Sequence, residues 1–521
     1  MSVVDGPCRG QSWRRNQRHF RGGHGRHAQA TWRIRSRHMT AVTRALRLQL
    51  FRLGKSPRSP IGDVEAGGRD AACEHVGTVV AYRLSRGSSP SASEQPMLGL
   101  VFDPSPRRLA IGGALSRLKP GAALSGHGPL SLREMPDPRL PGEGWLTLEP
   151  SFVGVCGSDV TEATLQADWD NPLSGLVSFP HVMGHEIVAR VAGATVPGFD
   201  AGATVVVNPW LGCAPRGITV PCTACAQGMT PLCVHAGEPI AGVDGSGIHT
   251  GNIRGLPGGM GTRMVAHGSQ VRRLPDGLDP PAGVLADPLA VGLHAAGRAI
   301  REWRDGDRSA APRHSRPRAA ETAGHSPGDL VVVLGAGTVG LAVAASLRRL
   351  GVDRVLVSAA WPYQRELVEA VGGQAISHRP EDAVHRVAGA TGGRLSRPWR
   401  GGPWLISGGA AAVVDAVGST ATLELALALV RPGGTVVRVG VGRARRLQAT
   451  LTYFKEVSVV GSNGYRRQDL DTALAMLAGG EVPWRRWLTH RFALSEWRQA
   501  FRTAAQPQRH AAVKVTIAVR P

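Results

Sequence analysis

The chain has 521 residues, of which 61 are basic and 39 are acidic, and its formal net charge is +22. Its 68 glycines and 37 prolines are typical of a turn-rich fold rather than a helical bundle, and no apolar run approaches the roughly 18 residues that a membrane-spanning helix needs. Only four of the basic residues are lysine, so the charge indicates an arginine-rich composition rather than a nucleic-acid-binding surface. We therefore expect roughly two or three folded domains, with no specific nucleic-acid partner and no membrane partner.

Residues 1–96 carry 17 basic and 6 acidic side chains, and they show no sustained strand or helix period. A segment rich in Arg, Gly, Ser and His buries too little apolar surface to fold, so we expect a disordered basic extension. Three alternatives stay open. Residues 41–53 have the partly helical spacing of a targeting segment, the tail could bind polyanions nonspecifically, and Met97 is a candidate for the real start of the protein.

Short strand-like runs separated by glycine and proline begin at Met97. Each run alternates in polarity or stays apolar over strand length, which predicts a small, irregular β-barrel domain over residues 97–292. The runs lie at 97–103, 145–149, 186–191 and 203–208.

Residues 293–452 change to alternating strands and helices, which is the pattern of a parallel α/β sheet. Residues 301–328 are rich in arginine, proline and alanine without periodicity, so we expect a loop insert there. We expect residues 453–521 to return to the first domain and pack on it.

Four of the seven cysteines fall within the 21 positions from Cys213 to Cys233. The Cys-x2-Cys spacing within this set supplies two thiolates at the separation that tetrahedral zinc takes, and two more cysteines complete a four-sulfur set. The alternative is a pair of disulfides, which the reducing cytoplasm expected for this chain disfavours. The predicted structural zinc ligands are Cys213, Cys222, Cys225 and Cys233.

A second set of metal-ligand residue types lies at predicted turns between strands. Cys156 opens the sequence Cys-Gly-Ser-Asp, and His185 and Glu186 follow a glycine just before a strand. A thiolate and an imidazole leave zinc needing further donors, which Glu186 or Asp287 could supply. Taken one at a time these residues are more often structural, so the hypothesis of a catalytic zinc site depends on their convergence.

A glycine-rich turn after residue 334 is the fingerprint of a dinucleotide-binding unit. An apolar strand leads directly into this turn, and a helix and a second strand follow it. The first glycine permits the tight turn, the second lets the backbone approach a pyrophosphate, and the third allows close packing of helix on sheet. The strands are expected at 330–334 and 354–358, the helix at 341–350, and the cofactor contacts at Gly335, Gly337, Thr338, Val339 and Gly340.

The end of the second strand bears on the choice between NAD and NADP. NAD-binding proteins usually place an acidic residue there to hold the ribose hydroxyls, but residues 358–365 contain none. Ser358 and Arg365 are suited instead to a 2′-phosphate. We therefore expect NADP in preference to NAD.

These motifs together resemble the zinc-dependent alcohol dehydrogenases of the medium-chain dehydrogenase/reductase superfamily, and most of all the branch with sorbitol and threonine dehydrogenases. The resemblance implies a GroES-like β-barrel catalytic domain over 97–292, completed by 453–521, and a Rossmann doubly wound parallel sheet over 293–452. The motifs that carry it lie at 155–159, 180–186, 213–233, 287–291, 335–340, 414–418 and 431–436.

The resemblance also implies an activity, which is reversible hydride transfer between an alcohol or polyol and NADP or NAD. One catalytic and one structural zinc, a small-molecule alcohol or carbonyl substrate, a homodimer or homotetramer and a cytoplasmic location go with it. The alternative function is a non-catalytic NAD(P)-binding protein on the same scaffold that retains only the structural zinc.

The resemblance assigns roles to individual residues. Cys156 and His185 match catalytic zinc ligands, Asp287 stands where the family has a Cys or Glu ligand, and Glu186 matches a carboxylate that is a ligand or near-ligand. The cysteine lobe departs from the family by an insertion around residues 214–220.

Three further roles concern the segment after Cys156. Asp159 matches a group that orients the metal site, and Ser158 matches the hydroxyl that takes the alcohol proton. Thr161 stands where the family often has a histidine that continues the proton path, so the path here is expected to differ.

Overall fold

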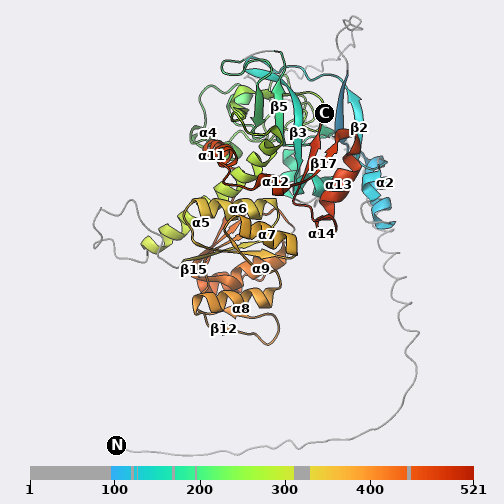
Figure 1. The fold of residues 1–521 in the computed structure, drawn as a ribbon. Helices are drawn as coiled ribbons and strands as arrows, with labels where there is room; N and C mark the ends of the chain where they lie inside the picture. The colour runs from blue at the N-terminus through green and yellow to red at the C-terminus, as the bar shows by residue number, and fades with distance from the viewer. Residues whose placement is uncertain are drawn as a thin grey trace, which may run out of the picture. The chain divides into compact units, whose positions relative to one another are not determined.

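The computed structural model describes residues 96–520 except 119–121, 126, 167–170, 194–195, 310–328 and 443–446 (Figure 1). The described residues belong to one compact unit. The expectation of disorder over residues 1–96, apart from residue 96, lies outside them, as does the expected loop over 310–328.

Seven strands form the main sheet of the first domain. They are β3 (Trp145–Val155), β5 (Glu186–Val191), β6 (Thr204–Val207), β7 (Met264–His267), β8 (Val271–Arg273), β17 (Leu488–Ala493) and β18 (Lys514–Ala518). The order is β17-β18-β3-β5-β6-β8, with β7 paired to β3, and every pairing except β17 with β18 is antiparallel. The strands expected near residues 145, 186 and 203 are therefore confirmed. The C-terminal strands join the same sheet, since β18 pairs with β3.

A smaller sheet, β2-β1-β4, completes this domain. Its strands are β1 (Met97–Phe102), β2 (Leu130–Met135) and β4 (His181–Val182). The strand expected at Met97 is confirmed.

A six-stranded parallel sheet forms the second domain, in the order β11-β10-β9-β14-β15-β16. The strands are β9 (Leu330–Leu334), β10 (Arg354–Ala359), β11 (Gln374–Ser377), β14 (Ala410–Asp415), β15 (Val430–Arg438) and β16 (Ser458–Gly461). The chain moves outward from β9 to one edge and then returns to build the other side, which is a doubly wound sheet.

Helices cover both faces of the parallel sheet. Val331 and Val333 of β9 point into a core with α5 (Ala286–Ser309), α6 (Thr338–Arg349) and α7 (Pro362–Ala370), whereas Val332 of the same strand packs with α8 (Pro380–Thr391) and α9 (Thr420–Leu429). Because both faces are covered, β9 is apolar throughout rather than alternating.

One core joins the two domains. It contains Val188 of β5 and Val206 of β6 together with residues of α5, α6 and β9. In addition, Thr338 Oγ1 donates to the carbonyl of Val513 at 2.8 Å. The glycine-rich turn and the first-domain sheet are thus held against each other by packing and by a direct hydrogen bond.

Two expected boundaries require correction. Helix α5 continues to Ser309, so residues 301–309 are helical and not part of a loop; they contain no proline, and the first proline of the insert is Pro312. The parallel sheet continues through β16 to Gly461, past the expected domain boundary at residue 452. β16 is short and lies at an edge, so its few residues carry little apolar pattern.

Smaller elements complete the described structure. The remaining helices are α2 (Pro106–Leu118), α3 (Gly157–Ala163), α4 (Thr223–Ala226), α10 (Thr450–Lys455), α11 (Arg467–Ala478), α12 (Trp484–Trp487), α13 (Trp497–Ala505) and α14 (Pro507–His510), and the remaining strands are β12 (Leu395–Ser396) and β13 (Trp404–Leu405). Short 3-10 turns lie at Ala122–Ser125, Pro172–Leu176, Ala214–Arg216, Thr230–Leu232, Gly268–Gln270, Pro280–Leu285 and Leu494–Glu496.

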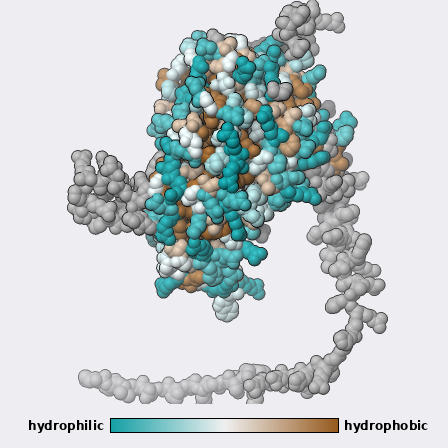
Figure 2. All heavy atoms as spheres, in the orientation of Figure 1, coloured by the Kyte–Doolittle hydropathy of each residue, from teal (hydrophilic) through white to brown (hydrophobic). Residues whose placement is uncertain are grey.

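Hydrophilic side chains predominate on the face shown in Figure 2, with hydrophobic residues visible in smaller areas between them. Among the helices of the described residues, none combines the length and the apolar character needed to cross a membrane.

Candidate metal and cofactor sites

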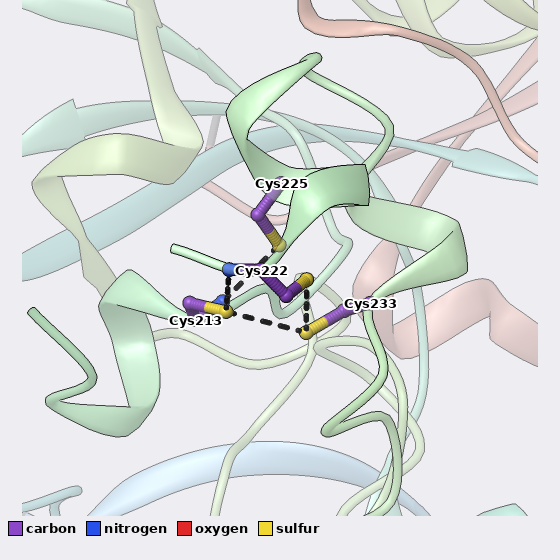
Figure 3. Close-up of side chains that lie close together, drawn as sticks. All are labelled: Cys213, Cys222, Cys225 and Cys233. Carbon is purple, nitrogen blue, oxygen red and sulfur yellow. Dashed lines mark hydrogen bonds between the residues drawn. The ribbon is translucent and has the colours of Figure 1, made fainter. Parts of the chain in front are cut away.

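The four cysteines of the lobe converge on one point (Figure 3). Their sulfur atoms all lie within 4.8 Å of one another. Cys213 Sγ is 3.7 Å from Cys233 Sγ, and Cys222 Sγ is 4.0 Å from the same sulfur. Two sulfurs on a tetrahedral zinc are about 3.8 Å apart, given Zn–S bonds of about 2.3 Å. The five cysteines in the described part of the chain are free, so no disulfide competes with a metal there.

Backbone donors favour the thiolate of one cysteine in this lobe, whereas burial raises the pKa of Cys225 and of Cys233. The N–H groups of Cys213 and Cys222 point at sulfurs of the set, at 3.4 Å to Cys225 Sγ and 3.3 Å to Cys213 Sγ. Backbone N–H groups of Cys225 and Val234 lower the pKa of Cys222 to about 6. The four-sulfur donor set therefore fits zinc.

The inserted residues 214–220 supply an arginine to the same lobe. Arg216 donates to the carbonyls of Leu211, Gly212 and Gly247, the last two at 3.2 and 2.9 Å. Its Nε is buried without a hydrogen-bond partner. Burial lowers the pKa of Arg216, while the charges of Cys233 and Glu238 favour its cationic form. This insertion thus brings a positive charge next to four thiolates.

A second group contains Cys156, His185 and Glu186, whose ligand atoms also lie within 4.8 Å of one another. Strand pairing explains their convergence, because Gly154 near the end of β3 is opposite Glu186 at the start of β5. A Cβ on Gly154 would lie 1.9 Å from Glu186 Oε2, so only glycine leaves room for that carboxylate. Gly184 has φ +96, a left-handed conformation that sets the turn before His185.

Asp159 orients this group. Its Oδ2 accepts the N–H of Cys156 at 2.9 Å, and its Oδ1 lies 3.5 Å from His185 Nδ1. Burial opposes the charge of Asp159, but the charge of His185 and these hydrogen bonds lower its pKa below the ordinary value. A carboxylate on Nδ1 leaves the Nε2 of His185 for a metal. A thiolate, an imidazole and a carboxylate in one partly buried group fit a catalytic zinc.

Glu186 has a partner that the sequence pattern did not reveal. Lys514 Nζ of β18 donates to both carboxylate oxygens at 2.7 Å, and both side chains are buried. Burial alone would lower the pKa of Lys514, but the charge of Glu186 raises it above the ordinary value. Lys514 is one of four lysines in the chain and lies in an apolar strand-like run. A rare lysine in such a run was the only sequence feature that could have indicated a buried ion pair.

Asp287 does not belong to the group of mutually close ligand atoms. It lies in the first turn of α5, and its Oδ1 accepts a hydrogen bond from the Tyr465 hydroxyl at 2.7 Å. Burial, opposed by the charge of His185 and aided by that of Glu186, raises the pKa of Asp287 to about 6. Asp287 therefore borders the site without joining Cys156 and His185 in it.

Ser158 and Thr161 are both exposed on α3, beside Cys156. Thr161 Oγ1 donates to the carbonyl of Gly157 at 2.8 Å, so its hydroxyl proton is engaged within the helix. Ser158 is exposed two residues after Cys156 in the chain.

His249 also borders the metal group, although no periodic pattern or motif in the sequence pointed to it. Its ring centroid lies 5.3 Å from that of His185 and 5.5 Å from that of Trp210. Burial, and then the positive charge of His185, lower the pKa of His249 to about 3.

The glycine-rich turn has the conformation expected for a dinucleotide. Gly335 has φ +98, and a Cβ on Gly340 would lie 1.8 Å from the Gly335 carbonyl oxygen. Helix α6 begins at Thr338, directly after Gly337, so its N-terminal N–H groups are available to a pyrophosphate. The turn therefore fits the pyrophosphate of a nicotinamide dinucleotide, and Val339 packs at the edge of the core beneath it.

Ser358 and Arg365 differ in how accessible their side chains are to a cofactor. The Ser358 hydroxyl accepts the N–H of Gly335 at 2.9 Å and is buried, so it supports the turn itself. Arg365 is exposed on α7.

Two family models match the chain. The alcohol dehydrogenase GroES-like domain matches residues 142–276, and the zinc-binding dehydrogenase domain matches residues 338–479. The L-galactonate-5-dehydrogenase of Escherichia coli (strain K12) is 27% identical over 366 residues, which cover 69% of this chain and 87% of that protein. A sorbitol dehydrogenase of Halalkalibacterium halodurans is 26% identical over 381 residues, covering 72% of this chain and 92% of that protein.

Solved structures show the same fold. Alcohol dehydrogenase TADH from Thermus sp. ATN1 superposes with a TM-score of 0.55 at 26% identity, over 75% of this chain and 97% of that one. L-idonate 5-dehydrogenase from Escherichia coli superposes with a TM-score of 0.57 at 18% identity, over 82% and 99%. No finding favours a non-catalytic protein. The chain is a zinc- and NAD(P)-dependent oxidoreductase that belongs to the zinc-dependent alcohol dehydrogenase family of the medium-chain dehydrogenase/reductase superfamily, in its sorbitol dehydrogenase-like branch.

Proposed function

We propose that this dehydrogenase oxidises a secondary hydroxyl of a polyol or sugar acid, or reduces the matching ketone, with NADP(H). The observation that carries the proposal is the partly buried group of Cys156, His185 and Glu186, with the exposed Ser158 two residues after Cys156. The names of the relatives, which refer to galactonate and sorbitol, support the substrate class.

Cys156 and His185 would hold the catalytic zinc, with Glu186 as a third donor or as a carboxylate next to it. Bound zinc supplies Lewis-acid polarisation of the substrate oxygen, which lowers the pKa of a coordinated hydroxyl. Asp159 fixes the ring of His185 through Nδ1. Lys514 holds Glu186 at both oxygens, so Glu186 must loosen that pair if it is to bind a metal directly.

Ser158 would take the proton of the substrate hydroxyl while the carbon-bound hydrogen leaves as hydride to the nicotinamide ring. The alcohol thus loses one proton and one hydride, and the ketone remains. Thr161 donates back to the helix, so the proton leaves Ser158 toward solvent rather than through a neighbouring side chain.

NADP is proposed over NAD because the end of β10 carries Ala359, followed by no acidic residue before Arg365. Ser358 is engaged by the glycine-rich turn, which leaves Arg365 as the candidate for the 2′-phosphate. Titration with both cofactors tests this assignment.

A reducing, cytoplasmic setting and a dimer or tetramer are further parts of the proposal. The free thiols of the cysteine lobe support a reducing setting, because an oxidising compartment would convert them to disulfides whenever zinc is absent. Sedimentation of the purified chain tests the second.

The decisive experiment for the function compares two cysteine variants. Cys156→Ala should abolish turnover of polyols, keep NADP binding, and reduce bound zinc from about two ions per chain to about one. Cys222→Ser should lose the other zinc. Full turnover by Cys156→Ala would refute the catalytic assignment.

A further inference from the structure

His249 is held rigidly beside the metal group. Trp210 and His249 form an isolated antiparallel bridge, and the next residue, Thr250, donates its N–H to the carbonyl of Pro209 at 2.9 Å. The buried side chain of Gln270 donates to Thr250 Oγ1 at 3.2 Å. The backbone that carries His249 is thus anchored on both sides.

The hydrogen bonds of His249 decide its tautomer. Its Nδ1 lies 2.8 Å from the carbonyl oxygen of Thr250. A carbonyl only accepts, so Nδ1 carries the proton and Nε2 presents a lone pair. Within the described residues no hydrogen bond to Nε2 is found, and the side chain is only partly buried.

The same ring is too far from the cysteine–histidine–glutamate group to be one of its members. It faces that group nonetheless, since its centroid is 5.3 Å from the His185 ring at an angle of 50°. Trp210 makes an edge-on contact with the same ring, at 5.5 Å and 75°. The Nε2 acceptor of His249 therefore belongs to a ring that lies next to the metal group without being part of it.

We propose that His249 Nε2 accepts a hydrogen bond from a second hydroxyl of the substrate, on the carbon next to the one that is oxidised. This inference rests on the proposed function and deepens it, because it makes His249 a specificity-determining residue for vicinal diols. The two imidazole rings lie side by side, so an oxygen held next to His185 leaves the neighbouring hydroxyl within reach of His249. A monoalcohol would leave the His249 lone pair without a partner.

The test compares 2,3-butanediol with 2-butanol, which lacks the second hydroxyl. His249→Phe keeps a planar ring without the lone pair and should lower kcat/KM for the diol by about 10–100-fold, while the value for 2-butanol changes by less than about 3-fold. His249→Gln, which keeps an acceptor, should retain more diol activity than His249→Phe. His385→Phe, a change on the exposed surface of α8, is the matched control.

The remaining outcomes overturn the inference in distinct ways. Equal losses on both alcohols would indicate that His249 only packs, and loss of one zinc in His249→Phe would indicate a ligand instead. An unchanged diol preference in His249→Phe would also refute the role. If the wild-type protein oxidises neither alcohol nor any polyol, the proposed function is refuted. If it is active but His249→Phe keeps the same preference for the diol over 2-butanol, only the role of His249 is refuted.

Discussion

Lys514 Nζ lies 2.7 Å from both carboxylate oxygens of Glu186 and thereby joins residues that are 328 positions apart. The pair is buried and borders the catalytic metal group. It ties the last strand of the chain to the segment that carries His185. The C-terminal segment thus contributes directly to the site.

Removing one partner of this pair should be costly. Lys514→Met leaves the Glu186 charge buried and unpaired, so we expect the free energy of unfolding to fall by about 3–5 kcal/mol. The double variant Glu186→Gln with Lys514→Met should recover a large part of the loss, because no unpaired charge remains. Urea denaturation measures both, and Arg397→Met in the exposed pair with Glu381 is a control expected to cost under about 1 kcal/mol.

The pH dependence of this pair follows from the raised pKa of Lys514. The contribution of the Lys514 charge to stability is complete below the ordinary pKa of 10.5 and is lost only as pH rises through the higher pKa of the folded state. If Lys514→Met were as stable as the wild-type protein at neutral pH, a stabilising role of the pair would be contradicted.

Arg216 should control how tightly the cysteine lobe holds its metal. Four thiolates around one zinc carry a net charge of about −2, and the partly buried Arg216 lies next to them. We expect Arg216→Met to release zinc to a chelator about 10-fold more readily, with the zinc of the Cys156 group retained. Arg254→Met, which removes an exposed partner of Asp244, is the control. Identical release from the two variants would show that charge compensation is unimportant.

Cofactor choice should depend on Ala360, which directly follows β10 and is only partly buried, whereas Ala359 packs in the apolar core. Ala360→Asp would place a carboxylate at the carboxyl end of β10, where it would accept hydrogen bonds from the ribose hydroxyls and repel a 2′-phosphate. The preference for NADP over NAD should fall by about 10–100-fold in kcat/KM. Arg365→Met should weaken NADP and leave NAD unchanged. A wild-type protein that already prefers NAD would contradict the premise.

Lys455 should contribute to stability through the C-terminus of α9. Its buried Nζ donates to the carbonyls of Leu427, Ala428 and Val430 at 2.8, 3.1 and 2.8 Å. Lys455→Met would leave these carbonyls without that donor, so we expect a loss of about 2–4 kcal/mol in urea denaturation. Arg386→Met, on the exposed side of α8, should have little effect.

Burial lowers the pKa of Lys455 to about 8 from 10.5. Between these values the unfolded chain binds the proton more than the folded chain does, so stability should rise with pH across that window. Lys455→Met should lack this component of the slope. An identical slope in both proteins would argue against the pKa shift.

Local patterns in the sequence predicted the parts of the fold that depend on neighbours along the chain. The apolar run of β9, the glycine-rich turn and a helix after it were expected, although α6 begins at Thr338 rather than at residue 341. The period of a strand and the conformational needs of Gly335 are local properties. The grouping of Cys213 with Cys233 was equally predictable, since a metal lobe repeats ligands at short spacing.

Only the tertiary structure decided which side chains contact one another at the catalytic metal group. Tyr465 holds Asp287 across 178 positions, and Lys514 holds Glu186 across 328, so no sequence window contains either pair. His249 lies beside His185 in a segment that bridges to Trp210, which no local pattern indicates. By itself the sequence determined the two domains, the cysteine lobe and the dinucleotide turn. Packing of the C-terminal strands and helices decided which carboxylates remain near the metal group and with which partners, because burial makes an unpaired charge too costly to leave.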